Sequence, residues 1–443
     1  MGALVLACAL AGGCTATTAE DPAPSASPSA PSSSASAAEP VTLRFAVYGD
    51  DGSVRAYEDL ADVFTRISPN VTVEVEQSAD EDAALANLRK DADAGEAPDM
   101  FLIDHDHLPA LIEEDLVQPV DSLLEERQID FGDGFQRDGL AAFAAATRLQ
   151  CMPNDVSPTV VYYNKDLVDF ARLVEDDDEP PNAEDGWTWE EFATAARQAS
   201  RGKSKGVYLE PALESLAPFV WSAGADIVDD GQEPTSLTLS EGDTREALEQ
   251  VLALVRDPQV TPTPEELERR DAVSRFQNGR LGMIVGDRSL TPRLREVEGL
   301  KFDVMPLPSL GSYRTIADMT GYCISADTEH LEAAADFLAF AVGREGQTVT
   351  SSPGYVVPAN LQVAHSQAFT QSGQQPADSF VFNEGVQRSQ TTPFVPEWPE
   401  LQEEIRPDLE RLFYAPVVDL DVLLEQIDSR SQQVLAPAVP AER

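Results

Sequence analysis

The alternation of strand and helix patterns after Val41 limits the possible folds more than any other feature. VTLRFAV and NVTVEVEQ have the alternating polarity of strands, and between them the apolar residues of positions 54–67 fall on one face of a helix. A second helical segment ends at Gly95, and the buried strand pattern DMFLID follows. This order predicts a mainly parallel α/β sheet with helices on its faces. The same alternation returns later, in TVVYYN, WEEFATAARQAS, GVYL, TREALEQVLALV, LGMIVGD, CISAD and EAAADFLAFAV.

Length and charge exclude several classes of protein. The 443 residues allow two or three domains. With 31 basic and 78 acidic side chains, the net charge is −47, which excludes binding to duplex nucleic acid through clustered cations and argues against adhesion to anionic lipid through a basic patch. No apolar run reaches the roughly 20 residues needed to cross a bilayer.

The first 40 residues differ from the rest. MGALVLACALAGGC is an apolar run that ends in small residues and Cys14, and it resembles a bacterial lipoprotein signal in which Cys14 is lipidated. The alternative is a short apolar tail with an incidental cysteine. Residues 15–40 are rich in Ala, Ser and Pro and contain no aromatic residue, so we expect a disordered linker that holds a folded body away from the membrane.

No catalytic motif stands out in the sequence. We find no G-x-S-x-G elbow, Walker loop, H-E-x-x-H helix or G-x-G-x-x-G turn after a strand. Carboxylates are so numerous that pairs at glycosidase-like spacing carry no information. The sequence therefore favours a binding protein, and an enzyme, for example a carbohydrate-active one, is the second class.

Two loops that follow strands are candidate ligand sites. Asp104, His105, Asp106 and His107 follow DMFLI directly, and ligands of open α/β sheets bind beyond the carboxyl ends of strands. Contact with a polar ligand, binding of a transition metal and simple loop capping all remain open for this cluster. The second candidate, Tyr48 to Gly52 (YGDDG), suits a sugar, because Tyr offers a flat face and Asp accepts hydrogen bonds from hydroxyls. An ordinary strand-to-helix turn is its alternative.

The tryptophans divide by context. Thr188 and Glu191 predict a capping box, so the neighbouring Trp187 and Trp189 are expected to anchor a helix. Trp221 and Trp398 lie next to Gly- or Pro-marked breaks, where stacking on a sugar and packing in the core are both open.

Seven blocks in order carry a resemblance to a known family: LRFAVYGDDG, APDMFLIDHDHLPALIEEDLVQPVD, SPTVVYYNKDL, GWTWEEF, FQNGRLGMIVGD, GYCISADTEHLEAAADFLAFAVGREGQ and FVPEWPEL. They resemble the extracellular solute-binding proteins of bacterial ABC importers, and within them the maltose-binding-like family 1. The resemblance covers nearly all of residues 41–430.

This resemblance implies a fold and a function. The fold would be the two-lobed α/β type II periplasmic-binding-protein fold, whose lobes are joined by hinge strands and close on a ligand, without catalysis, cofactor or metal. The implied boundaries are 1–14 signal peptide, 15–40 linker, 41–159 plus 322–375 first lobe, 160–321 plus 376–432 second lobe and 433–443 tail. The function would be capture of a sugar or oligosaccharide outside the membrane for a permease, by a monomer tethered through its lipid anchor alone.

Site residues follow from the same resemblance. The implied ligand contacts are Tyr48, Asp50, Asp51, Asp104, Asp106, Trp221 and Trp398. After LGMIVG the chain has Asp287, Arg288 and Ser289 where maltose-type proteins place an aromatic platform, which leaves room for an acidic or modified sugar bound by Arg288. A non-sugar solute such as a polyamine, a peptide or a metal is the alternative ligand.

The resemblance also implies a disulfide. It places Cys151 just before the SPTVVYYNK strand and Cys323 on the GYCISAD strand, side by side where the lobes meet. Disulfides persist in exported proteins. Two separate buried thiols are the alternative.

Overall fold

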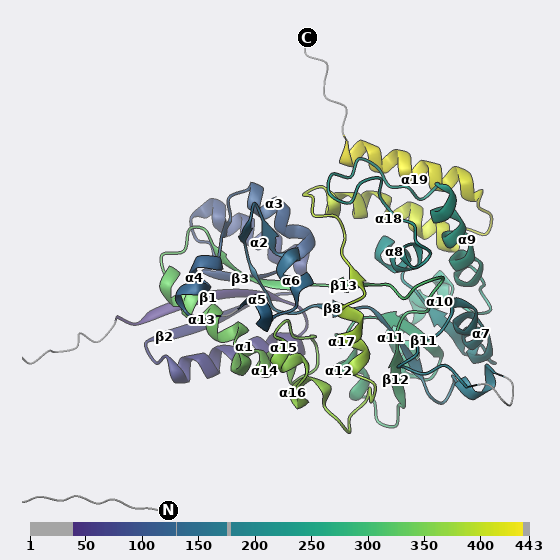
Figure 1. The fold of residues 1–443 in the computed structure, drawn as a ribbon, viewed down its shortest axis with the longest axis horizontal. Helices are drawn as coiled ribbons and strands as arrows, with labels where there is room; N and C mark the ends of the chain where they lie inside the picture. The colour runs from purple at the N-terminus through teal and green to yellow at the C-terminus, as the bar shows by residue number, and fades with distance from the viewer. Residues whose placement is uncertain (1–38, 130, 175–178, 437–443) are drawn as a thin grey trace, which may run out of the picture. The chain divides into compact units, whose positions relative to one another are not determined.

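Strand β1 (Val41–Tyr48) organises the first of two α/β lobes in the computed structural model, which describes residues 39–129, 131–174 and 179–436. The six-stranded sheet has the order β2-β1-β3-β14-β4, and β7 also pairs with β14. Figure 1 labels β1, β2 and β3 of this sheet. Strand β1 pairs in parallel with β2 and β3, whereas β14 runs antiparallel to β3. The predicted parallel unit is therefore confirmed, and a strand from much later in the chain completes it.

The second lobe has its own four-stranded sheet, in the order β10-β11-β9-β12. Strands β10 and β11 are parallel, but β9 is antiparallel to both β11 and β12. This sheet is therefore mixed, because β9 runs in the opposite direction to β10, β11 and β12. Together the two sheets give the α/β type II binding-protein fold.

The strands lie at the following positions: β1 as above, β2 Val71–Ser78, β3 Met100–Asp104, β4 Val117–Gln118, β5 Ala144–Ala145, β6 Arg148–Leu149, β7 Met152–Pro153, β8 Ser157–Pro158, β9 Val160–Asn164, β10 Lys205–Tyr208, β11 Leu281–Gly286, β12 Phe302–Met305, β13 Thr315–Asp318, β14 Thr320–Ser325 and β15 Ser389–Gln390.

The α-helices in the described ranges are α1 Asp51–Ile67, α2 Glu81–Ala94, α3 Leu108–Glu113, α4 Asp121–Glu126, α5 Phe131–Gly134, α6 Arg137–Ala142, α7 Trp189–Ala199, α8 Leu213–Ser222, α9 Gly242–Val255, α10 Pro264–Arg269, α11 Ala272–Gln277, α12 Leu290–Arg295, α13 Leu331–Val342, α14 Arg344–Ser351, α15 Leu361–Ala364, α16 Gln367–Thr370, α17 Phe380–Val386, α18 Trp398–Tyr414 and α19 Leu420–Leu435. Within those ranges, none of these helices combines the length and apolarity of a membrane span.

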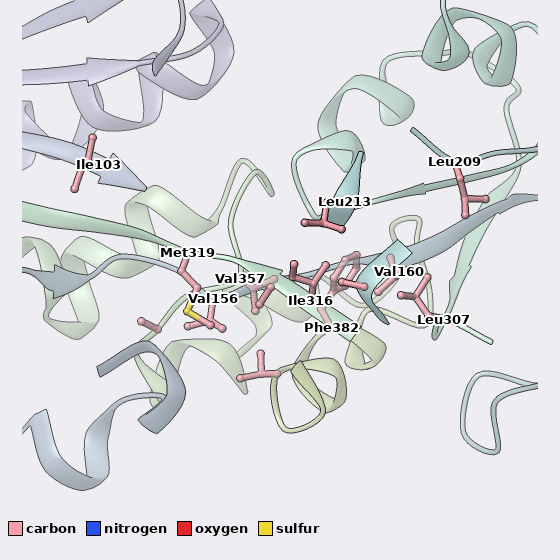
Figure 2. Close-up of a cluster of buried hydrophobic side chains, with 14 of the residues drawn as sticks. Ile103, Val156, Val160, Leu209, Leu213, Leu307, Ile316, Met319, Val357 and Phe382 are labelled. Carbon is pink, nitrogen blue, oxygen red and sulfur yellow. The ribbon is translucent and has the colours of Figure 1, made fainter. Parts of the chain in front are cut away.

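A third, small sheet lies where the chain passes between the lobes. It has the order β15-β13-β8; β8 leads directly into β9 of the second lobe, and β13 leads into β14 of the first. Its apolar side chains are buried with those of distant segments. Figure 2 shows Val156, Met319 and Val357 in one part of this cluster and Ile316 and Phe382 in another. Burial of these side chains gives both chain crossings a shared apolar support.

Local signals in the sequence explain the helix boundaries. The side chain of Asp50 caps α1 by accepting hydrogen bonds from the amides of Gly52 and Ser53, at 3.0 and 2.9 Å. Thr188 and Glu191 form the predicted capping box of α7. Gly95 ends α2 in a left-handed conformation that residues with a side chain rarely adopt. These helices therefore begin and end at residues that satisfy their free backbone groups.

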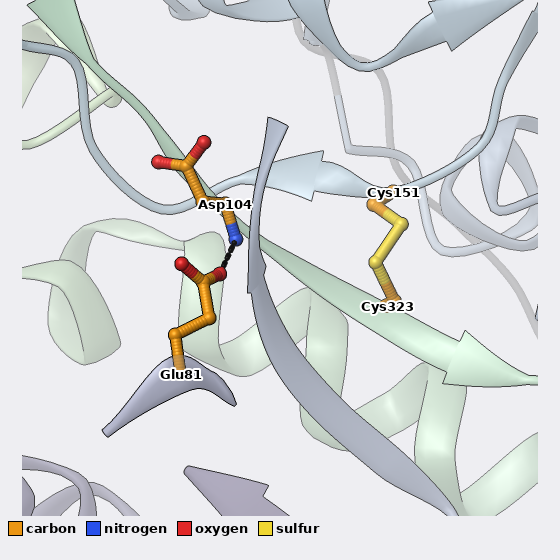
Figure 3. Close-up of a disulfide and its surroundings, with 4 residues drawn as sticks. All are labelled: Glu81, Asp104, Cys151 and Cys323. Carbon is orange, nitrogen blue, oxygen red and sulfur yellow. Dashed lines mark hydrogen bonds between the residues drawn. A yellow bond between two sulfur atoms is a disulfide. The ribbon is translucent and has the colours of Figure 1, made fainter. Parts of the chain in front are cut away.

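The predicted disulfide is confirmed. Cys151 and Cys323 are bonded, their Cα atoms are 4.5 Å apart, and both side chains are buried. Cys323 lies on β14, and Cys151 immediately precedes β7, which pairs with β14. The bond joins the end of the first α/β unit to the strand that returns to it (Figure 3).

We expect the Cys151→Ser/Cys323→Ser double variant to be less stable by about 4 to 5 kcal/mol, because the bond closes a loop of 172 residues and restricts the unfolded chain. Urea unfolding of the oxidised wild type and the variant measures the difference. Thiol titration of the denatured, unreduced wild type is the control. Two titratable thiols at these positions would contradict the bond.

Candidate functional site

A cavity of 440 Å³ lies beyond the carboxyl ends of strands from both lobes. The loop after β3 borders it on one side, and the ends of β10 and β11 border it on the other, as expected for ligand sites in open α/β sheets. Its principal lining residues are Glu81, Asp104, His105, Asp106, His107, Thr159, Glu210, Glu214, Asp287, Asp318, Thr392, Gln402 and Arg406. Strand β13 and helix α18 contribute the last part of the wall.

The lining is strongly acidic. Seven carboxylates reach the cavity, and the basic side chains on it are Arg406 and two histidines. Among the lining residues that the structure describes there is no Trp, Tyr or Phe. The site is thus rich in hydrogen-bond acceptors and lacks the flat apolar surfaces on which sugar rings stack.

Glu81, Asp104 and Asp318 interact with one another in the cavity wall. The backbone N–H of Asp104 donates to Glu81 Oε1 at 2.8 Å (Figure 3). Desolvation and the charge of Asp104 raise the pKa of Asp318 well above its ordinary value. Burial by itself would raise the pKa of Asp104, but hydrogen bonds with Asp318 and His105 lower it below its usual range. Asp104 is therefore the ionised member of the pair, and Asp318 carries the proton.

Burial and the charge of Asp104 also raise the pKa of Glu81, to about 8. Burial raises the pKa of Asp106 to about 7, although the charge of His105 opposes the change. Part of this carboxylate cluster is therefore protonated near neutral pH when the cavity holds no ligand.

His105 lies between two carboxylates. Its Nδ1 is 3.3 Å from Asp104 Oδ1, its Nε2 is 3.1 Å from Asp106 Oδ1, and the side chain is buried. Burial opposes protonation, but the charges of Asp106 and Asp104 prevail and raise its pKa to about 9. Thr392 hydrogen-bonds Asp106, which ties the loop after β3 to the segment after β15.

Asp104, His105 and Asp106 are candidate ligands for a metal ion. Their ligand atoms lie within 4.8 Å of one another. Each ring nitrogen of His105 faces a different carboxylate, however, and the raised pKa makes the ring an imidazolium. A metal ligand must be a neutral imidazole. The arrangement is therefore that of an ion-paired cation, and it does not favour a metal.

Helices α8 and α18 supply a further part of the wall. Glu214, in the first turn of α8, accepts a hydrogen bond from Gln402 of α18, and Arg406 lies one turn further along α18. Burial raises the pKa of Glu214. These helices therefore present both a carboxyl group and a guanidinium group to the cavity.

The turn after the first strand does not reach the cavity lining. Asp50 caps α1, and Asp51 Oδ1 accepts a hydrogen bond from Gln77 at 3.3 Å. Tyr48 is half-buried at the end of β1 and is not part of the lining. For Asp50 and Asp51 the simpler interpretation, a strand-to-helix turn, is correct in this structure. The predicted ligand contacts of Asp50 and Asp51 are corrected accordingly. Burial and the charges of the lining residues Glu81 and Asp104 raise the pKa of Tyr48, so it lies beside the cavity wall and its ligand contact stays a prediction.

The two candidate stacking tryptophans are core residues in this structure. Trp221 is 5% exposed, and its Nε1 donates to Asp226 at 3.1 Å. Trp398 is 0% exposed at the start of α18. Neither lines the cavity, although the first turn of α8 and the middle of α18 do. Each tryptophan belongs to a helix that borders the cavity elsewhere, but its own side chain is buried in the hydrophobic core, so the predicted stacking contacts are corrected.

Arg288 also requires a correction. Its side chain is 0% exposed and lies between the rings of Phe369 and Phe382, 4.8 and 5.0 Å from their centroids. Its guanidinium donates to Ser379 Oγ and to the Phe369 carbonyl, and burial lowers its pKa to about 10. The aromatic faces and these acceptors hold the cation inside the protein. It cannot bind an acidic sugar in the cavity, which its neighbour Asp287 lines instead.

Several lining residues were missed by sequence reasoning. Asp287 immediately follows β11 and Glu210 lies two residues beyond β10, close to strand ends as Asp104 is, so the rule that selected Asp104 could have selected them. Glu81, Thr392 and Arg406 have no local signal, because only the folded chain brings α2, the segment after β15 and α18 to the same cavity.

The chain is similar in sequence to known bacterial binding proteins. Residues 59–377 match the family model described as bacterial extracellular solute-binding protein. A protein of Brucella abortus described as a binding protein is 23% identical over 389 residues, covering 86% of this chain and 89% of that protein.

Solved structures agree in fold. An ABC substrate-binding protein from Listeria monocytogenes, in complex with cycloalternan, has a TM-score of 0.78 at 20% identity, covering 89% of this chain and 99% of the other. The GacH receptor of Streptomyces glaucescens, solved unliganded and with acarbose, has a TM-score of 0.74 at 17% identity and covers 89% and 98%. A maltotriose-binding protein of Thermus thermophilus, bound with maltotriose, has a TM-score of 0.71 at 17% identity and covers 88% and 99%.

The raised pKa of Glu81 predicts how stability depends on pH. A carboxyl that is protonated in the folded protein but ionised in the unfolded chain stabilises the fold at low pH, and this contribution is lost as pH rises from about 4.5 to about 8. Glu81→Gln should flatten the decline, which amounts to about 1.4 kcal/mol per pH unit for each proton that the two states bind differently. The amide oxygen of Gln can still accept from Asp104.

Urea unfolding of wild type and variant at pH 5, 6, 7 and 8 measures this effect. Glu58→Gln, at an exposed position of α1, is the matched control and should keep the wild-type slope. Parallel curves for wild type and Glu81→Gln would contradict the assignment.

Proposed function

Because the chain belongs to the bacterial extracellular solute-binding proteins, we propose that it captures a sugar or oligosaccharide outside the membrane for an ABC importer. The similar proteins from Listeria and Thermus were solved with cycloalternan and maltotriose, which supports a saccharide ligand. The partner that receives the ligand would be the permease of the importer.

The observation that carries this proposal is the cavity itself. Its walls come from the strand ends of both sheets, so one ligand can contact both lobes at once. Carboxylate, Thr and Gln side chains can hydrogen-bond sugar hydroxyls. A ligand that touches both walls favours their approach, as in other hinged binding proteins. In this proposal the lobes comprise 41–159 plus 322–375 and 160–321 plus 376–432, and the protein acts as a monomer.

Binding without catalysis suits the site. The solute-binding family supplies ligand capture, and Asp104 and Asp318, whose pKa values are shifted in opposite directions, are engaged with each other rather than with a positioned nucleophile. We therefore propose that these carboxyls hold the ligand. The protein would need no cofactor for this role.

The charge of the cavity favours a second candidate, a cationic solute such as a polyamine. Seven acidic side chains share the cavity with Arg406 and the ion-paired His105. A neutral ligand would therefore leave much of the repulsion between the carboxylates in place. An ammonium group would offset it. A saccharide that carries an amino group would satisfy both arguments, whereas an acidic sugar would add to the repulsion.

We expect Asp104→Asn to weaken ligand binding at least tenfold, which is about 1.4 kcal/mol, because Asp104 is an ionised acceptor in the cavity wall. A thermal-shift panel of maltose, maltotriose, glucosamine, glucose and spermidine finds the ligand, and calorimetry then compares the variants. Asp62→Asn, at an exposed position of α1, is the control and should bind as the wild type does.

The outcomes of the panel separate the candidates. Stabilisation by a saccharide supports the importer proposal. A preference for glucosamine over glucose would also support the argument that the acidic cavity favours a ligand with an ammonium group. Stabilisation by spermidine with no response to any saccharide would reject the sugar in favour of the cationic solute. Equal affinity of Asp104→Asn and wild type would place the site elsewhere.

We also propose that lipid on Cys14 anchors the protein at the outer face of the cytoplasmic membrane. Residues 1–38 lie outside the described residues, so this proposal rests on the apolar opening segment and the linker composition. Cys14→Ser should move the protein from the membrane fraction into the medium. Cys8→Ser is the matched control and should leave it attached. Membrane retention of Cys14→Ser would contradict the anchor.

A further inference from the structure

A second cavity, of 740 Å³, lies at the opposite edge of the second-lobe sheet. Lys205 begins β10, and Arg280 immediately precedes β11, so this cavity borders the amino ends of the two parallel strands. The acidic cavity borders their carboxyl ends at Glu210 and Asp287. The six residues of β11 separate the two regions by roughly 20 Å, at about 3.3 Å per residue. They are therefore distinct sites.

The charge of the second cavity reverses that of the chain. Six of its 12 lining residues are basic, whereas the whole chain has 31 basic residues in 443. They are Lys203, Lys205, Arg269, Arg270, Arg275 and Arg280. One carboxylate, Glu266, lines the cavity with them. A net charge of −47 predicts no such patch, but the fold brings together cations from residues 203–205 and 269–280.

The inner part of this cavity is preorganised. Glu266 lies 3.2 Å from Lys205 Nζ and 3.3 Å from an Nη of Arg275, so it holds both cations in position. Arg275 is 9% exposed, and its buried Nε has no hydrogen-bond partner among the described residues. A buried donor without a partner is costly.

The outer part is open. Lys203, Arg269, Arg270 and Arg280 are exposed, and in the described part of the chain no carboxylate lies within ion-pair distance of them. One carboxylate cannot balance six cations, so the cavity keeps an excess positive charge in a protein that otherwise repels anions.

We propose that this basic cavity binds a phosphate group. Arg and Lys side chains that converge on a concave surface are suited to the several oxygens of a phosphate, because guanidinium groups donate in pairs and ammonium groups act as point charges. The phosphate belongs either to a free anion or to the headgroup of an anionic lipid. Occupancy leaves the ligand cavity free, since the two regions lie at opposite ends of β10 and β11. The assignment does not depend on the importer proposal.

Calorimetry and phosphorus NMR with inorganic phosphate and pyrophosphate test the site at constant ionic strength, with chloride as the reference anion. We expect pyrophosphate to bind, and Arg269→Gln/Arg270→Gln to weaken that binding at least tenfold. Arg55→Gln/Arg66→Gln on α1 is the matched control, because it removes the same charge from exposed positions outside the cavity. The control should bind pyrophosphate as the wild type does. In a separate series, a higher ionic strength should weaken pyrophosphate binding by both proteins.

A vesicle arm separates the two sources of phosphate. The full chain with Cys14→Ser, which lacks the proposed anchor, is mixed with vesicles of phosphatidylglycerol or of phosphatidylcholine. Sedimentation with phosphatidylglycerol alone, lost in Arg269→Gln/Arg270→Gln, assigns the headgroup, and pyrophosphate binding without sedimentation assigns the free anion. Absence of both, or equal binding by the control and cavity variants, would overturn the proposal.

Discussion

The antiparallel pairing of β14 with β3 is the interaction on which the candidate site depends. Its register places Thr320 opposite Asp104, so Asp318, two residues earlier on β13, lies next to the loop after β3. The disulfide from Cys323 on the same strand fixes this segment to the residue before β7. A slip by one residue would reverse the sides of the strand and separate the two carboxyls. Strand pairing therefore sets the position of Asp318 beside Asp104.

Electrostatic repulsion is the cost of this arrangement. Asp104 and Asp106 come from the first lobe and Glu210, Glu214 and Asp287 from the second, so approach of the walls brings like charges together. Protons held on Asp318 and Glu81 and the imidazolium of His105 reduce the repulsion. A ligand with hydrogen-bond donors or positive charge replaces that internal compensation. Ligand capture and proton binding are thus linked in one set of side chains.

The sequence was sufficient for the fold but only in part for the site. Periodicity, the capping box of Thr188 and the order of family-like blocks predicted the α/β lobes, and the resemblance placed Cys151 beside Cys323. Asp104 and Asp106, selected because strand ends mark ligand sites, line the cavity. Trp398 and Arg288 were misassigned, because the sequence does not show which side of a helix or turn faces the core. Glu81 and Arg406 reach the cavity only through tertiary packing.

Net charge is a poor guide to local chemistry in this chain. Strands β10 and β11 carry acids at their carboxyl ends and cations at their amino ends, so the second lobe has opposite charges at its two edges. At the ionic strength of a cell the screening length is about 8 Å, shorter than the roughly 20 Å length of β11. Each edge therefore acts on its own partner with little influence from the other. A protein with a charge of −47 can in this way attract cations or hydroxyl groups at one cavity and anions at another.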